Sequence, residues 1–284
     1  MKTSFENDVL KCRFKMHTQQ THFGGSISVL WINAPHLWIA FAATIFLMMF
    51  HYLSPWFAAL LPGNGRTFVS FAGGVAVAYV FLDMLPNLVE YNKPIGDFLI
   101  NNQWLTPFNE LLIYIFALFG FLIYFGFDLL AERYREKGHD DFLVYGLHLT
   151  MFCLYNFLIT YTMSLRAISS LTATILFTLA MALHFVLTDR KFCRFYQVQF
   201  NHRGRFLLIS ALLTGWLCSV IFDPVNVLIV ALMVSFLAGS VLLNVFREEL
   251  PAAGLASYCW FASGAVLITL ILSLRTWILV VSSV

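Results

Sequence analysis

Two stretches of this sequence decide the predicted fold: SFAGGVAVAYVFLDMLP at Ser70–Pro86 and SFLAGSVLLNVFREELP at Ser235–Pro251. They align without a gap, and an acid in the first, Asp83, falls opposite an acid in the second, Glu248. The paired identical residues include Gly74 with Gly239, Val80 with Val245, Phe81 with Phe246, Leu85 with Leu250 and Pro86 with Pro251. The matched glycines and prolines indicate that one unit occurs twice in the chain.

The composition places both copies in a membrane. Of 284 residues, 60% are apolar, 17% are aromatic and only 11% are charged, which is too little charge for a wetted surface. A disordered chain, a disulfide scaffold, a coiled coil and a nucleic-acid binder are all excluded by this composition. The five cysteines show no metal-ligand or redox spacing, and we interpret them as reduced packing residues. The expected partner is the lipid bilayer.

Apolar runs of about 20 residues, the length that spans a bilayer core, divide the chain further. We predict an all-α polytopic fold with eight transmembrane helices in residues 35–284 and an extramembrane N-terminal tail in residues 1–34. The eight runs are Leu37 to Leu61, Thr67 to Leu88, Leu111 to Leu130, Phe142 to Met163, Ser170 to Thr188, Phe206 to Phe222, Val225 to Phe246 and Ala256 to Val280.

The distribution of Lys and Arg predicts the orientation. The connections after the odd-numbered spans carry ten such residues, mostly at Ala131–Asp141 and Thr188–Arg205, whereas the loops and C-terminus on the other side carry only Lys93, Arg166 and Arg275. The N-terminal tail carries four more, which lie about twenty residues from the first span and count for little there. The positive-inside rule makes the ten-charge side cytoplasmic and both termini extracytoplasmic. The expected location is a bacterial inner (plasma) membrane.

With this topology the two matching stretches cross the membrane in opposite directions. Residues of about 35–130 and 206–284 would then form inverted repeats around the central helices 142–188. Inverted repeats are typical of alternating-access transporters. The small residues Ala72–Gly74 and Ala238–Ser240 allow close helix approach, and they also permit a homodimer.

Ionisable residues within or near apolar spans are candidate site residues. Asp83, Glu110 and Asp128 lie near span ends, where we expect water or headgroups to solvate them. His51 is expected at the outer interface of the first span. Arg275 in the eighth span is expected to reach the interface with its long side chain.

The fourth and fifth spans carry the densest set of metal-ligand side chains. His148, Tyr155, Asn156 and Thr160 share one stripe of the fourth span, next to Cys153, and His184 on the fifth span is followed by Thr188 and Asp189. Folding this hairpin brings His184 level with Cys153 and close in depth to His148 and Asn156. The set is open to three interpretations: a transition-metal site, a hydrogen-bonded core network, or a proton path through the two histidines.

The sequence resembles the ZIP family of zinc and iron permeases. FAGGVAVAYVFLDMLPNL resembles the second span of that family, SFLAGSVLLNVFREELP its seventh, and TLAMALHFVLTD the start of its fifth-span metal motif. The resemblance covers most of Ser70–Pro251 and implies eight spans, external termini and a three-plus-two-plus-three inverted repeat.

The chemistry of the motif departs from the family. The fifth-span pattern His-Glu-x-Pro-His-Glu stands here as His184-Phe-Val-Leu-Thr188-Asp189, and the fourth-span stretch Phe152–Asn156 keeps an amide and a thiol without a carboxylate. A divalent ion leaving water needs anionic donors, so the two-metal centre of the family is depleted in this chain.

These observations predict a ZIP-like transporter for a divalent ion such as zinc or iron, or for another small solute. His184 is the expected main ligand, His148, Asn156, Cys153 and Asp189 assist, and Asp83, Tyr155, Thr188 and Glu248 line the pathway. The alternative is a non-transporting protein of the same fold that binds a lipid or protein partner through the basic segment Arg190–Arg205. An enzyme is not expected, because no hydrolase motif is present.

Overall fold

The computed structural model describes residues 34–60, 66–90, 111–136, 141–221, 227–249 and 257–282, and within these ranges the chain is helical without a strand. The helices, some of which contain five-residue π-helical segments labelled η, are α3 (Pro35–Leu60), α4 (Arg66–Tyr79), η1 (Val80–Met84), α5 (Leu85–Glu90), α7 (Leu112–Glu136), α8 (Asp141–Ser169), α9 (Leu171–Phe195), α10 (Gln197–Gln199), η3 (Phe200–Gly204), α11 (Arg205–Ile221), α12 (Val227–Asn244), η4 (Val245–Glu249) and α13 (Tyr258–Ser282).

These helices confirm the predicted class, an all-α polytopic membrane protein. Seven of the described helical segments are long and apolar enough to cross a bilayer, and the shorter apolar stretch Ala231–Arg247 lies where the seventh span was predicted. The tail of residues 1–33, Glu110 and the C-terminal part of the second matching stretch lie outside the described residues.

Three predicted spans, the third, fourth and fifth, end too early, and the fifth shows the largest difference. We expected the fifth span to end near Thr188 and a polar connection to follow, but α9 continues to Phe195, and α10 and η3 then lead directly into α11. The helix continues because Thr188 and Asp189 are buried among other helices and do not face solvent. Much of the basic segment after Thr188 is therefore helical.

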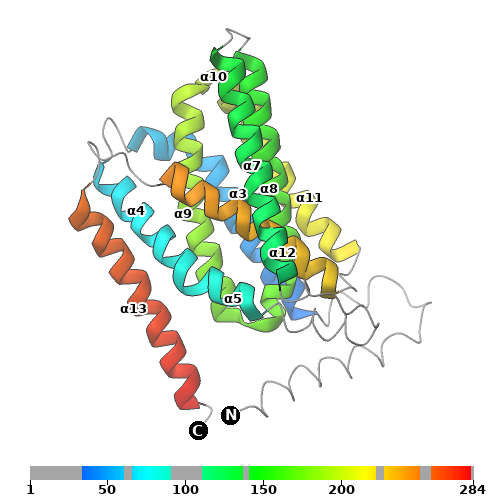
Figure 1. Ribbon diagram of the computed structural model, residues 1–284, viewed down its shortest axis with the longest axis vertical. Helices are drawn as coiled ribbons and strands as arrows, with labels where there is room; N and C mark the ends of the chain where they lie inside the picture. The colour runs from blue at the N-terminus through cyan, green and yellow to red at the C-terminus, as the bar shows by residue number, and fades with distance from the viewer. Residues whose placement is uncertain are drawn as a thin grey trace.

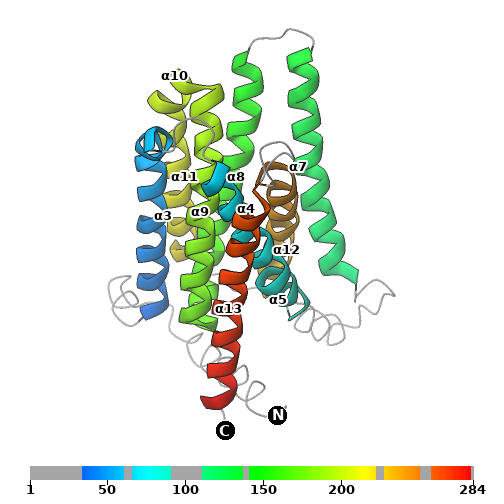
Figure 2. The same cartoon turned by 90° about the vertical axis from the view of Figure 1, so that its left-hand side faces the viewer.

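Four helices, α3, α8, α9 and α11, form a central bundle (Figures 1 and 2). The contact between α8 and α11 is close because Gly215 has no side chain: a Cβ there would lie 2.3 Å from the Phe157 carbonyl oxygen. The hydroxyl of Thr160 donates to the Leu212 carbonyl oxygen at 2.7 Å across the same contact. Apolar side chains fill the rest of the bundle, among them Leu47, Ile159 and Met163.

Two helix pairs flank this bundle, α4 with α13 and α7 with α12. In the first pair, a Cβ on Gly74 would lie 2.0 Å from the Phe261 carbonyl oxygen, and one on Gly264 would lie 2.1 Å from the Phe71 carbonyl oxygen. Glycine is therefore required at both positions for the backbones to approach this closely.

The second pair repeats this contact. A Cβ on Gly239 would lie 1.7 Å from the Ala117 carbonyl oxygen, and one on Gly120 would lie 2.1 Å from the Phe236 carbonyl oxygen. Gly239 and Phe236 are the residues that align with Gly74 and Phe71 in the two matching stretches. The same sequence positions therefore make the same contact in both pairs.

The matching stretches also share a local irregularity. The α-helix changes to π-helix at Val80 in the first and at Val245 in the second, which are aligned residues, and both π-segments span five residues. In Figure 1, α4 runs downward toward α5, whereas α12 runs upward toward the start of α13, so the two stretches point in opposite directions. These are the relations that an inverted repeat requires.

Candidate functional site

A buried pair of ionisable side chains lies in the central bundle. His51 Nδ1 on α3 lies 2.8 Å from Asp189 Oδ2 on α9, and each side chain is only 1% exposed. Asp189 follows Phe185 by four residues, which places both on the face of α9 that packs against α3. The Phe185 ring stacks on the His51 imidazole with centroids 4.3 Å apart.

The local structure of α3 favours this position of His51. Pro55 lies four residues later within the helix and has no N–H to donate to the His51 carbonyl oxygen. The hydroxyl of Ser54 donates to that oxygen instead, at 2.8 Å. The carbonyl oxygen that loses its helical partner at the proline therefore still accepts a hydrogen bond within the apolar span.

Our expectation for His51 was wrong. The sequence analysis placed it at the outer interface because it lies near a proline toward the end of the first span, whereas it is buried and bonded to Asp189. The pairing joins residues far apart in the sequence, so spacing within one span could not reveal it. A histidine inside an apolar run was the only available signal.

Several buried polar atoms of the central bundle have no hydrogen-bond partner among the described residues. They include His51 Nε2, Asp189 Oδ1 and both polar atoms of Asn156, a side chain that is 1% exposed on α8. A buried polar atom without a partner is costly, and such atoms often mark a functional position. The central bundle therefore holds a carboxylate, an imidazole and an amide with buried polar atoms that lack partners in the described structure.

His184 lies next to this pair. Its ring is 5.4 Å from the ring of Tyr155 and 6.0 Å from that of Phe185, and it is within electrostatic range of Asp189. Thr188 is buried one turn further along α9. Tyr155, His184, Thr188 and Asp189, all predicted site residues, are thus gathered in the central bundle.

The remaining predicted ligands lie elsewhere. His148 directs Nε2 to Asp128 Oδ1 on α7 at 3.3 Å and Nδ1 to the Val144 carbonyl oxygen at 3.0 Å, so both of its nitrogens are engaged. Cys153 is half-buried and packs against a cluster that includes Phe152 and Phe192. Across the described part of the chain, no three His, Cys, Asp or Glu side chains lie together as a metal site.

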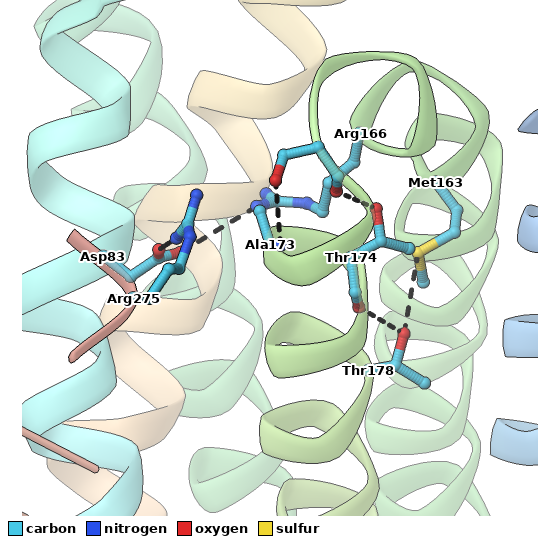
Figure 3. Close-up of polar contacts among 8 residues, drawn as sticks. Asp83, Met163, Arg166, Ala173, Thr174, Thr178 and Arg275 are labelled. Carbon is cyan, nitrogen blue, oxygen red and sulfur yellow. Dashed lines mark hydrogen bonds and ion pairs between the residues drawn. The ribbon is translucent and has the colours of Figure 1, made fainter. Parts of the chain in front are cut away.

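Asp83 also differs from expectation. We expected water or headgroups to solvate it, but it is 4% exposed, and Arg275 Nη1 on α13 lies 3.0 Å from its Oδ1. Arg166 Nη1, at the end of α8, lies 3.9 Å from Oδ2. Figure 3 shows the carboxylate between the two guanidinium groups. Arg275 therefore points to a buried acid and not to the interface.

Arg166 is held by a second contact. Its guanidinium lies 4.1 Å above the centre of the Phe177 ring of α9, a cation–π arrangement. This cluster of Asp83, Arg166 and Arg275, which we call the Asp83 latch, connects α8 to the α4–α13 pair.

A second cluster connects α8 to the α7–α12 pair. Arg247 on η4 forms a salt bridge with Asp128 of α7, and His148 of α8 binds the same carboxylate. We call these three residues the Asp128 latch. Glu248, the predicted pathway residue that aligns with Asp83, follows Arg247 on η4, but its side chain lies outside the described part of the structure.

Comparison with known proteins returned no match to a family model, a curated protein or a solved structure. The functional interpretation therefore depends on the sequence and the geometry.

Proposed function

We propose that this chain is a ZIP-like membrane transporter that carries a small cation by alternating access, with Asp189 as the anionic group that receives the ion. The observation that carries the proposal is the buried His51–Asp189 pair, whose other polar atoms, His51 Nε2 and Asp189 Oδ1, have no hydrogen-bond partner among the described residues. A carboxylate oxygen and an imidazole nitrogen are ligands for a borderline divalent metal.

The arrangement of the helices supports a carrier function. Two matching stretches with the same π-helical break pack against their own partner helices through the same glycine contacts, and they flank a bundle that holds the polar core. In transporters built from inverted repeats, the solute site lies near the bilayer midplane at the interface of the repeats.

The chemistry of the core limits the solute. Asp189 is a single carboxylate that is bonded to His51, and the Ser54 hydroxyl and the His184 imidazole lie near it. Such a set favours a cation that is bound weakly and released, in contrast to a resident structural zinc ion, which has four tight ligands. Zinc, iron and manganese are the divalent ions to test first.

Uptake into vesicles tests the proposal. The full-length protein in liposomes should take up radiolabelled Zn²⁺, Fe²⁺ or Mn²⁺ above protein-free vesicles, and Asp189→Asn should lower the initial rate at least about tenfold, the loss of about 1.4 kcal/mol of ion binding. The matched control is Glu132→Gln, which removes an exposed carboxylate at the end of α7. Equal uptake by wild type and Asp189→Asn would contradict the assignment of Asp189.

One observation favours the second candidate, a non-transporting protein of this fold that binds lipid. An apolar crevice of about 320 Å³ lies between α3, α9, α4 and α13, lined by side chains such as Phe50, Phe71, Leu183 and Ile268. Wild-type protein that takes up none of the three ions but co-purifies with a defined lipid would favour this candidate.

A further inference from the structure

The apolar crevice lies where the α4–α13 pair meets α3 and α9 of the central bundle. It has a volume of about 320 Å³, whereas a water molecule takes about 30 Å³ in the liquid. The described side chains that line it are all apolar, among them Phe71, Val75 and Ile268. A space of this kind offers water no hydrogen-bond partner and does not hold it. An apolar molecule is therefore the expected occupant.

The crevice opens to the lipid side of the protein. Leu179 of α9 and Leu267 of α13 both line it, and they are 51% and 46% exposed. Both helices are long and apolar enough to span a bilayer, so exposed apolar side chains on them face lipid chains. An acyl chain can therefore enter the crevice from the side without contact with water.

One end of the crevice adjoins the Asp83 latch. Arg275 follows the lining residue Ile271 by four residues, which is about one turn of α13. On α9, Leu176 lines the crevice and is adjacent to the aromatic ring over which the Arg166 guanidinium lies. Figure 3 shows both guanidinium groups directed at the same carboxylate. The apolar crevice thus ends at two arginines.

These arginines can attract an anion. The latch holds two guanidinium groups and one carboxylate, which leaves the cluster with one positive charge in excess. Arg275 Nη1 donates to Asp83 Oδ1 at 3.0 Å, and the Arg275 side chain is 21% exposed. A guanidinium has five N–H donors in a fork that matches the oxygens of a phosphate. Arg275 can therefore bind a phosphate and keep its bond to Asp83.

The cluster and the crevice are arranged as the parts of a phospholipid are. Arg166 lies three residues before the end of α8, and Arg275 lies seven residues before the end of α13. The ends of spans lie near the headgroup region, where lipid phosphates lie. From Arg275 to Leu267 the crevice extends inward by about 12 Å, the length of eight helical residues. A phosphate at the arginines would therefore direct an acyl chain into the crevice.

We propose that the crevice holds one acyl chain of an anionic phospholipid and that Arg275 binds the phosphate of that lipid. The excess positive charge selects the lipid class. In phosphatidylglycerol the phosphate charge is uncompensated, whereas in phosphatidylcholine an ammonium group cancels it. The site requires no ion transport and exists equally in a carrier, so its failure and that of the proposed function are distinguishable.

Photo-crosslinking tests the location. The full-length protein is placed in phosphatidylcholine liposomes with a trace of phosphatidylglycerol that carries a diazirine on its acyl chain, and labelled residues are mapped by mass spectrometry. We expect labelling to concentrate on Leu179 and Leu267. Leu267→Trp, which fills the crevice, should abolish the labelling of Leu179. Leu270→Trp, at an exposed position of the same helix, should leave it unchanged.

Two results would overturn the location. One is labelling of the crevice that is no stronger than that of exposed apolar side chains elsewhere, such as Leu118 and Phe119 of α7. The other is a crevice that takes no label, as expected if a second copy of the chain covers it.

Competition in detergent micelles tests the lipid class. Unlabelled phosphatidylglycerol should displace the label at about fivefold lower concentration than phosphatidylcholine, the effect of one arginine near an anionic lipid. Arg275→Gln should remove this preference, whereas Asp83→Asn, which adds to the excess charge, should strengthen it. Arg203→Gln, which removes an exposed arginine of η3, should leave it unchanged.

The opposite signs separate charge from folding, because a variant that is merely misfolded would lose labelling with both lipids. Asp83→Asn tests the charge by itself if Arg275→Gln does not fold. Equal competition by the two lipids in wild type, or a preference that Asp83→Asn lowers, would overturn the proposal. A preference retained in folded Arg275→Gln would do the same.

Discussion

At the residue scale, three carboxylates of the described helices, two of them buried and one partly buried, each meet basic side chains from other helices. Asp189 meets His51, Asp83 meets Arg275 and Arg166, and Asp128 meets Arg247 and His148. A charge deep in a low-dielectric region is tolerated when a partner and hydrogen bonds compensate its lost hydration. Each carboxylate therefore fixes a contact between helices, in addition to being an ionisable group.

Removing one side chain of such a charged cluster should lower the stability of the protein. Arg275→Gln leaves the buried Asp83 carboxylate with only the more distant Arg166, and we expect the free energy of unfolding to fall by about 3–5 kcal/mol. Denaturant unfolding in mild detergent measures this. The double variant Asp83→Asn/Arg275→Gln should recover much of the loss, because no uncompensated acid remains. An Arg275→Gln protein as stable as wild type would contradict the role of this pair.

The sequence could predict which residues were unusual but not their partners. His184, Thr188 and Asp189 were selected from their positions in one apolar run, and they lie together because helical spacing alone places them on α9. His148 was grouped with them because a hairpin brings it to a similar depth, but its side chain points to α7 instead. The depth of a residue in the membrane follows from its position along its helix. The direction of its side chain depends on how separate helices pack.

At the element scale, glycine contacts determine how the flanking pairs close. Gly74, Gly120, Gly239 and Gly264 each lie against a backbone carbonyl of the partner helix. The sequence identified Gly74 and Gly239 as small residues that allow close approach. Their partners on α7 and α13 could not be predicted, because the sequence does not show which helices pack against each other. Gly120 and Gly264 make close contacts because of how their helices pack, and composition alone does not indicate this.

Two glycines of α7 provide a matched test of these contacts. Gly120→Ala places a Cβ 2.1 Å from the Phe236 carbonyl oxygen, so α7 and α12 must separate, and we expect a loss of about 1–3 kcal/mol in stability. Gly126→Ala meets nothing within 4 Å and should leave stability unchanged or raise it by up to about 1 kcal/mol, since alanine favours helix. Thermal unfolding in detergent compares the two. Equal effects would contradict the close contact.

The starts of helices were predicted well where polar residues precede an apolar run. The spans beginning near Phe142 and Phe206 correspond to α8 and α11 within a few residues at their starts. The end of α9 was missed because Thr188 and Asp189 read as polar, although both are buried by neighbouring helices. The π-helical segments left no signal that spacing could reveal before the structure showed them.

At the scale of the whole molecule, the described helices form three bodies that a carrier could use. The central bundle of α3, α8, α9 and α11 holds the polar core, and the α4–α13 and α7–α12 pairs lie beside it (Figure 2). The bundle contacts the α4–α13 pair through α9 and the Asp83 latch. It contacts the α7–α12 pair along α8, where the Asp128 latch lies and the Tyr124 hydroxyl donates to the Met151 carbonyl oxygen at 2.7 Å. A carrier requires two discrete arrangements of such bodies around one site.

Exchange across the membrane tests the central claim most directly. Liposomes that contain the protein are loaded with unlabelled Zn²⁺, Fe²⁺ or Mn²⁺ and diluted into a trace of the labelled ion. A carrier with an alternately exposed site should accumulate the label transiently above its equilibrium level, and Asp189→Asn should abolish this overshoot. For all three ions, label entry that preloading does not stimulate, or that matches protein-free liposomes, would contradict the account.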